Sequence, residues 1–191
     1  MIASAGVDWI QIREKDLAAG ELATLTREAL QAGRTQVKGG FAATRILVND
    51  RLDVALTEGA GGVHLGENGL PVAEAKRLVE KHAPGEDFLL GVSCHSVEAA
   101  RSAAGNGASY VFFGPIFATP SKAAFGAPQG LGALSEVCRG VTIPVLAIGG
   151  ITLENAAACW AAGARGIAAI RLFQEASSPS AATAALRELM R

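Results

Sequence analysis

The sequence has no long hydrophobic run, although half of its 191 residues are hydrophobic. The apolar stretches are short and interrupted by glycine, so none could span a bilayer as a helix. We therefore expect a protein without contacts to membranes. The opening residues, "MIASAGVDWIQIREK", contain no basic leader followed by a small-residue cleavage site, and we expect no export signal.

Cysteines, aromatic residues and unbalanced charge are also scarce. The three cysteines, Cys94, Cys138 and Cys159, are an odd number without zinc-ligand spacing, which argues against a disulfide framework and favours the reducing cytoplasm. A net charge of −1 and an aromatic content of 5% leave neither the basic field nor the stacking surface that nucleic acid requires. Small-molecule chemistry in a single domain, residues 1–191, is the remaining expectation.

A repeated local pattern indicates the architecture. In several places a helical tail is followed by glycine and a small residue and then by a short apolar run: "EGAGGVHLG" at 58–66, "GNGASYVFFG" at 105–114 and "AAGARGIAAI" at 161–170. Glycine after a helix supplies the left-handed conformation that ends it. Uniformly apolar short runs are typical of parallel strands that are buried on both faces.

The pattern predicts alternating strands and helices, and hence a parallel α/β sheet. We expect strands near 8–12, 45–48, 62–65, 88–93, 110–113, 144–148 and 166–170. Helices are expected at 20–32, 51–58, 71–82, 96–105, 131–138, 153–162 and 180–190. These are seven strands, whereas a closed (β/α)8 barrel needs eight, and the opening "MIASAGVDWIQI" reads as the tail of a repeat. The fold prediction is a (β/α)8 TIM barrel with its first strand missing. An open doubly wound sheet remains an alternative, although no strand is followed by G-x-G-x-x-G.

Polar residues gather where the predicted strands end, which is where barrels place their chemistry. In "QIREKD", Gln11, Arg13 and Lys15 alternate and would share one side of a strand, facing an anion or solvent. Asn49-Asp50 follows the second strand as a site or as a helix cap. His64 lies in the third strand, as a site residue or a core histidine, with Glu67 beyond it. Ser93 and His95 follow the fourth strand, with Ser96 as a helix cap.

The last three strand ends predict anion binding. "VFFGPIFATPSK" ends the fifth strand with Thr119, Ser121 and Lys122, two hydroxyls and a cation suited to phosphate. Gly149 and Gly150 precede a helix capped by Thr152, where backbone N–H groups can approach a phosphate. Arg171 follows the last strand. Anion-binding groups in two clusters suggest two phosphorylated small molecules.

These segments taken together resemble the thiamine phosphate synthase and thiazole tautomerase superfamily. The similarity rests on "QIREK", "ILVNDRLDVALTEGAGGVHLGE", "GVSCHS", "FGPIFATPSK" and "IPVLAIGGITLENA", which occur in the family's order from about residue 5 onward. The resemblance implies a (β/α)8 barrel that joins an aminopyrimidine methyl diphosphate to a thiazole phosphate with the help of Mg²⁺. Members usually carry one more strand before the point where this chain begins.

The resemblance also implies roles for individual residues. It assigns the pyrophosphate to the catalytic residues Arg13, Lys15, Ser93 and Lys122 together with Asn49. It assigns Mg²⁺ to Asp50, with Glu67 as a second candidate ligand. The two substrates would be contacted by Gln11 and His64 on the pyrimidine side, by Thr119 and Ser121 on the thiazole side, and by Gly149, Gly150, Ile170 and Arg171 at the thiazole phosphate.

The sequence departs from the family pattern at two positions. Gly69 stands where synthases usually have an aspartate that binds metal, and Arg171 stands where serine is usual. The missing carboxylate would suit the metal-free tautomerase branch, whereas Pro115, Asn49-Asp50 and "TPSK" favour a synthase. A catalytically inactive relative that only binds a ligand or a partner is a further alternative. A homo-oligomer would cover the two sheet edges that a missing strand would leave exposed.

Overall fold

The computed structural model describes residues 5–34, 43–83, 85, 87–120 and 127–190. Every strand and helix predicted from the sequence is present there, and strand order in the sheet follows chain order from β1 to β7. The chain divides into two compact units, Met1–Gly91 and Val92–Arg191, with the boundary inside β4. The single domain over 1–191 stays a prediction.

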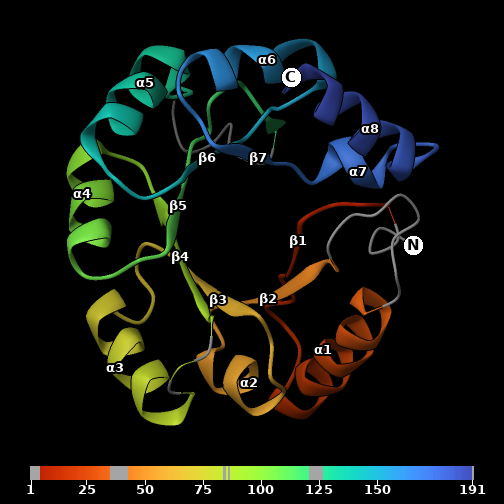
Figure 1. Cartoon of the computed structure of the whole chain (residues 1–191), viewed down its shortest axis with the longest axis vertical. Helices are drawn as coiled ribbons and strands as arrows, with labels where there is room; N and C mark the ends of the chain where they lie inside the picture. Colours follow the sequence, from red (N-terminus) through yellow and green to blue (C-terminus); the bar gives the residue numbers. More distant parts are fainter. Residues whose placement is uncertain (1–4, 35–42, 84, 86, 121–126, 191) are drawn as a thin grey trace. The chain divides into compact units, whose positions relative to one another are not determined.

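Strands and helices alternate in the first unit (Figure 1). In chain order its elements are β1 (Trp9–Ile12), α1 (Ala19–Gly33), β2 (Arg45–Asn49), α2 (Leu52–Thr57), β3 (Gly62–Leu65), α3 (Val72–His82) and the start of β4 (Leu89–Cys94). The three complete strands are parallel: Gln11 is in register with Leu47, and Asn49 with His64. Helices α1 and α2 pack against β2.

The second unit repeats the alternation. It contains α4 (Val97–Gly105), β5 (Tyr110–Phe113), α5 (Gly130–Gly140), β6 (Val145–Ile148), α6 (Leu153–Ala161), β7 (Gly166–Ala168), α7 (Arg171–Gln174) and α8 (Pro179–Leu189). Strands β5, β6 and β7 are parallel, and α4, α5 and α6 pack on β5, β6 and β7 respectively. The sequence pattern missed α7, because its single turn is too short for a periodic signal, and β7 ends two residues earlier than predicted.

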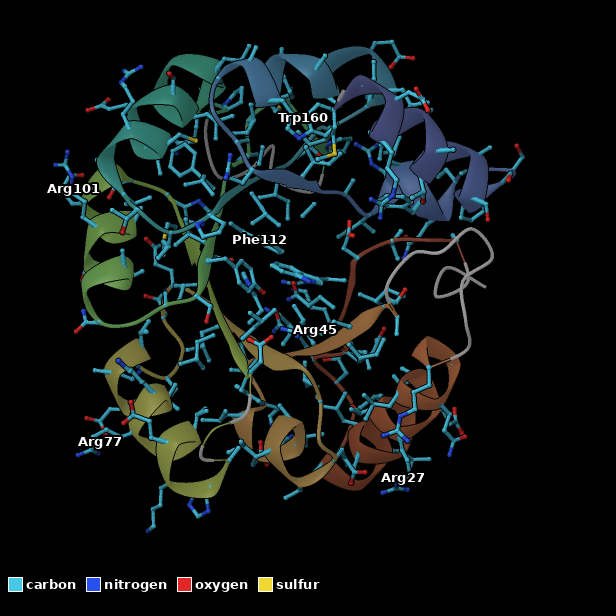
Figure 2. The ribbon with its side chains drawn as sticks, in the orientation of Figure 1. Arg27, Arg45, Arg77, Arg101, Phe112 and Trp160 are labelled. Atoms are coloured by element: carbon cyan, nitrogen blue, oxygen red, sulfur yellow. The ribbon has the colours of Figure 1, made fainter. Side chains whose placement is uncertain are left out.

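The strand interiors form the core of each unit. All four residues of β3 are buried and so are all four of β5, as expected of parallel strands covered on both faces. Arg27, by contrast, is exposed: Figure 2 shows it extending outward from α1, and its guanidinium donates two hydrogen bonds to Glu58, the residue that follows α2. Among the described residues, no helix has the length and hydropathy needed to cross a membrane.

Candidate functional site

A chain of hydrogen bonds joins the carboxyl ends of the first three strands. The Gln11 side chain donates from Nε2 to Asn49 Oδ1 (2.7 Å), and Asn49 donates from Nδ2 to Asp50 Oδ2 (2.7 Å). The other carboxylate oxygen, Asp50 Oδ1, accepts from the backbone N–H of Gly66 (2.7 Å). Parallel register brings these residues together, since carboxyl ends of neighbouring strands meet at one edge. Gln11, Asn49 and Asp50 therefore form one hydrogen-bonded polar group, and their roles toward a ligand stay a prediction.

The backbone at Asp50 turns sharply out of the strand. Its φ of 58° is positive, a conformation that Asp tolerates better than most residues because its short side chain bonds locally. The Asp50 N–H still donates to the His64 carbonyl (2.8 Å), so the ladder between β2 and β3 extends one residue past β2. The helix-cap interpretation of Asn49-Asp50 is wrong, because α2 has Arg51 at its N-cap and both side chains are engaged elsewhere.

His64 lies buried beside this group, with 2% of its surface exposed. Burial lowers the pKa of His64 to about 4, because the charged imidazolium would lose its hydration; the nearby Asp50 carboxylate raises it, and the Arg13 guanidinium lowers it further. The imidazole is therefore neutral at physiological pH. His64 is a core residue as well as a neighbour of the polar group, so its two interpretations are compatible.

The cations after β1 differ from their prediction. Strand β1 ends at Ile12, so Arg13 and Lys15 follow the strand and do not alternate along it with Gln11. Both are exposed, as is Glu67 beyond β3. Ser93, the penultimate residue of β4, is half-buried. The end of β1 at Ile12, the last residue paired with β2, agrees with the predicted strand near 8–12.

The described side chains around Asp50 are too few to hold a metal ion unless a bound substrate supplies further metal ligands. Among the described residues, no three His, Cys, Asp or Glu side chains come together as metal ligands. A Cβ placed on Gly69 would lie 3.2 Å from Asp50 Oδ1, so position 69 borders the carboxylate and contributes no ligand to it. Magnesium is commonly held by one or two carboxylates plus substrate phosphates. The donor set therefore suits Mg²⁺ that arrives with a diphosphate.

In the second unit, the segments after β5 and β6 are joined backbone to backbone. Ile116 N–H donates to the Ile148 carbonyl (2.9 Å), and Phe117 N–H donates to the Gly149 carbonyl (3.0 Å). Gly149 and Gly150 have φ values of 94° and 65°, and a Cβ on Gly149 would lie 2.5 Å from Pro115 Cβ. Only glycine suits this close approach.

The glycines lead directly into α6. Thr152 is the N-cap residue of α6, as predicted, and its N–H donates to Asn155 Oδ1 (2.8 Å). Asn155 in turn donates from Nδ2 to the Gly150 carbonyl (2.9 Å), which fixes the turn to the helix. The predicted arrangement of two glycines ahead of a helix N-terminus is present.

Arg171 and Thr119 are brought together from segments far apart in the chain. Arg171 Nη2 donates to Thr119 Oγ1 (3.2 Å). Ile170 precedes α7 as its N-cap residue and is 59% exposed. The predicted site residues Ser121 and Lys122 lie outside the described residues. Arg171 is thus placed beside at least one predicted thiazole-side residue.

His95 follows β4, and neither its sequence position nor the family resemblance assigns it a role in the site. Its ring nitrogen Nδ1 lies 2.5 Å from the carbonyl oxygen of Gly114. A histidine just after a strand is a weak signal, because nothing in the local sequence indicates a partner nineteen residues away.

The fold and these strand-end groups define a parallel α/β protein of the TIM-barrel-like class with polar groups suited to phosphorylated ligands. Comparison with known proteins identifies the family. A family model described as thiamine monophosphate synthase matches residues 1–173, and the chain belongs to that family. The resemblance drawn from the sequence motifs is confirmed.

Individual relatives agree along nearly the whole chain. A thiamine-phosphate synthase of Anaeromyxobacter dehalogenans is 46% identical over 95% of this chain and 77% of its own length. One of Methanoculleus marisnigri is 45% identical over 98% of this chain and 84% of its own. The solved structure of a thiamine phosphate pyrophosphorylase from Pyrococcus furiosus superposes with a TM-score of 0.81 at 32% identity, covering 98% of this chain and 85% of that one.

Proposed function

We propose that the chain couples 4-amino-2-methyl-5-pyrimidinylmethyl diphosphate with thiazole phosphate to give thiamine phosphate and pyrophosphate, as a transferase of thiamine biosynthesis. Membership of the thiamine monophosphate synthase family supports the activity. The observation that carries the proposal is the hydrogen-bonded group Gln11–Asn49–Asp50 closed on the Gly66 N–H. The group presents amides and a carboxylate at adjacent strand ends. The amides can form hydrogen bonds with the aminopyrimidine ring, and the carboxylate can hold a metal ion that binds the diphosphate.

The reaction breaks the C–O bond of the diphosphate, whose electron pair leaves with pyrophosphate, and the thiazole nitrogen then forms the new C–N bond. Arg13, Lys15 and Lys122 would neutralise the leaving pyrophosphate, with Asn49 and Ser93 as further hydrogen-bond partners. Mg²⁺, when bound, would supply additional charge neutralisation at the leaving group. Asp50 would hold it together with the substrate phosphates, and Glu67 is the proposed second carboxylate.

Gln11 and His64 would contact the pyrimidine. A pKa of about 4 keeps the His64 imidazole uncharged at neutral pH, so it would not repel the positive charge that develops on the pyrimidine as the C–O bond breaks. The buried imidazole would also help to exclude water, which could otherwise capture the cation.

The second substrate is proposed to bind to groups of the second unit. Thr119 and Ser121 would contact the thiazole. Gly149 and Gly150 would present backbone N–H groups to its phosphate ahead of α6, with Ile170 and Arg171 completing the contacts. Arg171 donates a hydrogen bond to Thr119, which supports a place for its guanidinium beside the thiazole-side residues.

Three further proposals concern the complete fold, the oligomeric state and the location in the cell. We propose the full (β/α)8 barrel as the family fold, to which the seven described strands would belong. A homo-oligomer and a cytoplasmic location are proposed for the reasons given by the sequence, namely sheet edges that need cover and free thiols.

A coupling assay with both substrates tests the function. Product that requires Mg²⁺ and is abolished by EDTA is the expected result. Asp50→Asn should weaken binding of Mg²⁺ with pyrophosphate in calorimetry about tenfold or more. Asp53→Asn is the matched control, because Asp53 is a nearby carboxylate that pairs with Arg51. Interconversion of thiazole tautomers without any coupling would reject the proposal.

A further inference from the structure

The side chain of His95 links the segment after β4 to the segment after β5. The Gly114 carbonyl oxygen can only accept a hydrogen bond, so the proton of the 2.5 Å contact must reside on Nδ1 of His95. Gly114 is buried, and its carbonyl would be costly to leave unpaired. His95 therefore satisfies a buried acceptor at the point where the chain leaves β5.

The backbone of His95 is itself held in place. Ser96, the next residue, caps α4 by accepting from the Ala99 N–H at Oγ (3.0 Å). His95 immediately precedes the N-cap residue of α4, so its backbone is held by the capped helix and its imidazole has a rigid support.

The Gly114 backbone is also packed closely against the end of β6. A Cβ on Gly114 would lie 2.0 Å from the Ile148 carbonyl oxygen, so the chain passes directly against the end of β6. The next residues donate from Ile116 N–H to Ile148 and from Phe117 N–H to Gly149. A shift at Gly114 would therefore be transmitted to Gly149.

We infer that His95 is a positioning residue: through the Gly114 carbonyl it holds the β5 exit segment against the Gly149 turn, and so sets the affinity for thiazole phosphate. The inference rests on the proposed function, which assigns thiazole phosphate to that turn. In this role His95 acts on the ligand through the backbone of the Gly114 segment.

Three variants test the role. His95→Ala should raise the KM and the calorimetric Kd for thiazole phosphate about tenfold, the effect of one unpaired buried carbonyl, while the KM for the pyrimidine diphosphate stays within about twofold. His95→Asn should restore the wild-type value, because its Nδ2 is as far from Cβ as Nδ1 of histidine. His95→Gln, whose amide lies one carbon further out, should behave like His95→Ala.

Several results would overturn the role: wild-type affinity in His95→Ala, equal loss for both substrates, or failure of His95→Asn to bind more tightly than His95→Gln. If His95→Ala does not fold, the comparison of the Asn and Gln variants decides. Thiazole phosphate binding without any coupling would reject the proposed function and leave this comparison valid.

An NMR measurement tests the hydrogen bond without any substrate. Imidazole ¹⁵N spectra of the wild type should show the Nδ1–H tautomer for His95, identified as the signal missing in His95→Asn among only three histidines. The Nε2–H tautomer for that signal would reject the contact and the inference with it.

Discussion

Acid should destabilise this protein through His64, and the size of the effect follows from its pKa. The pKa of His64 is lowered from 6.5 to about 4 in the folded chain. The unfolded chain therefore binds a proton as the pH falls through 6.5, whereas the folded chain does not until about 4. Stability is unaffected well above pH 6.5, falls between 6.5 and 4, and falls no further from this group below 4.

The expected magnitude is measurable. Each pKa unit corresponds to 1.36 kcal/mol, so His64 should cost about 2 kcal/mol of unfolding free energy at pH 5 and about 3 kcal/mol in total. That is a large part of the 5–15 kcal/mol typical of folded domains.

Urea unfolding followed by circular dichroism at pH 7 and pH 5, in metal-free buffer, measures this loss. His64→Gln removes the ionisation, so its unfolding free energy should fall by about 2 kcal/mol less than that of the wild type between the two pH values. His82→Gln, which removes an exposed imidazole, controls for the loss of a histidine as such. Parallel pH dependence of wild type and His64→Gln would refute the buried, neutral state of His64.

Three further substitutions have defined outcomes. Gly149→Ala should destabilise the protein by about 2 kcal/mol or more and weaken thiazole phosphate binding, because a Cβ at this positive φ would collide with Pro115. Gly132→Ala is the matched control, since the space around its Cβ is open. Equal stability of the Gly149→Ala and Gly132→Ala variants would contradict the predicted collision. Leu65→Ala should cost about 3 kcal/mol in chemical denaturation, since Leu65 is fully buried, and a loss below about 1 kcal/mol would show that the core closes around the gap. Lys122→Ala should lower the coupling rate about 100-fold by removing charge from the leaving group, and normal turnover would reject that role.

Sequence patterns predicted most of the fold because parallel strands buried on both faces leave a strong local signal. Uniformly apolar runs such as Tyr110–Phe113 and glycines after helices identified the strands and helix ends. The single turn α7 and the early end of β7 escaped prediction, since elements of three or four residues have no periodicity to recognise.

For the candidate site, the sequence likewise predicts the kinds of residues but not the contacts between them. The residue types at the strand ends and their positions follow from the sequence, and they indicate Gln11, Asn49 and Asp50 as candidate site residues. Residue types do not report partners, however, so the sequence left Asn49-Asp50 open as a helix cap until the contacts with Gln11 and Gly66 excluded it.

The sequence by itself therefore determined the alternation of strands and helices, the family and the kinds of groups at each strand end, because local propensity and residue chemistry decide these. Tertiary structure alone decided which groups meet: the neutral state of buried His64, the closeness of Gly69 to Asp50, and the bond from His95 to Gly114. Those depend on burial and on register between segments distant in sequence, and neither quantity is encoded in any short stretch of the chain.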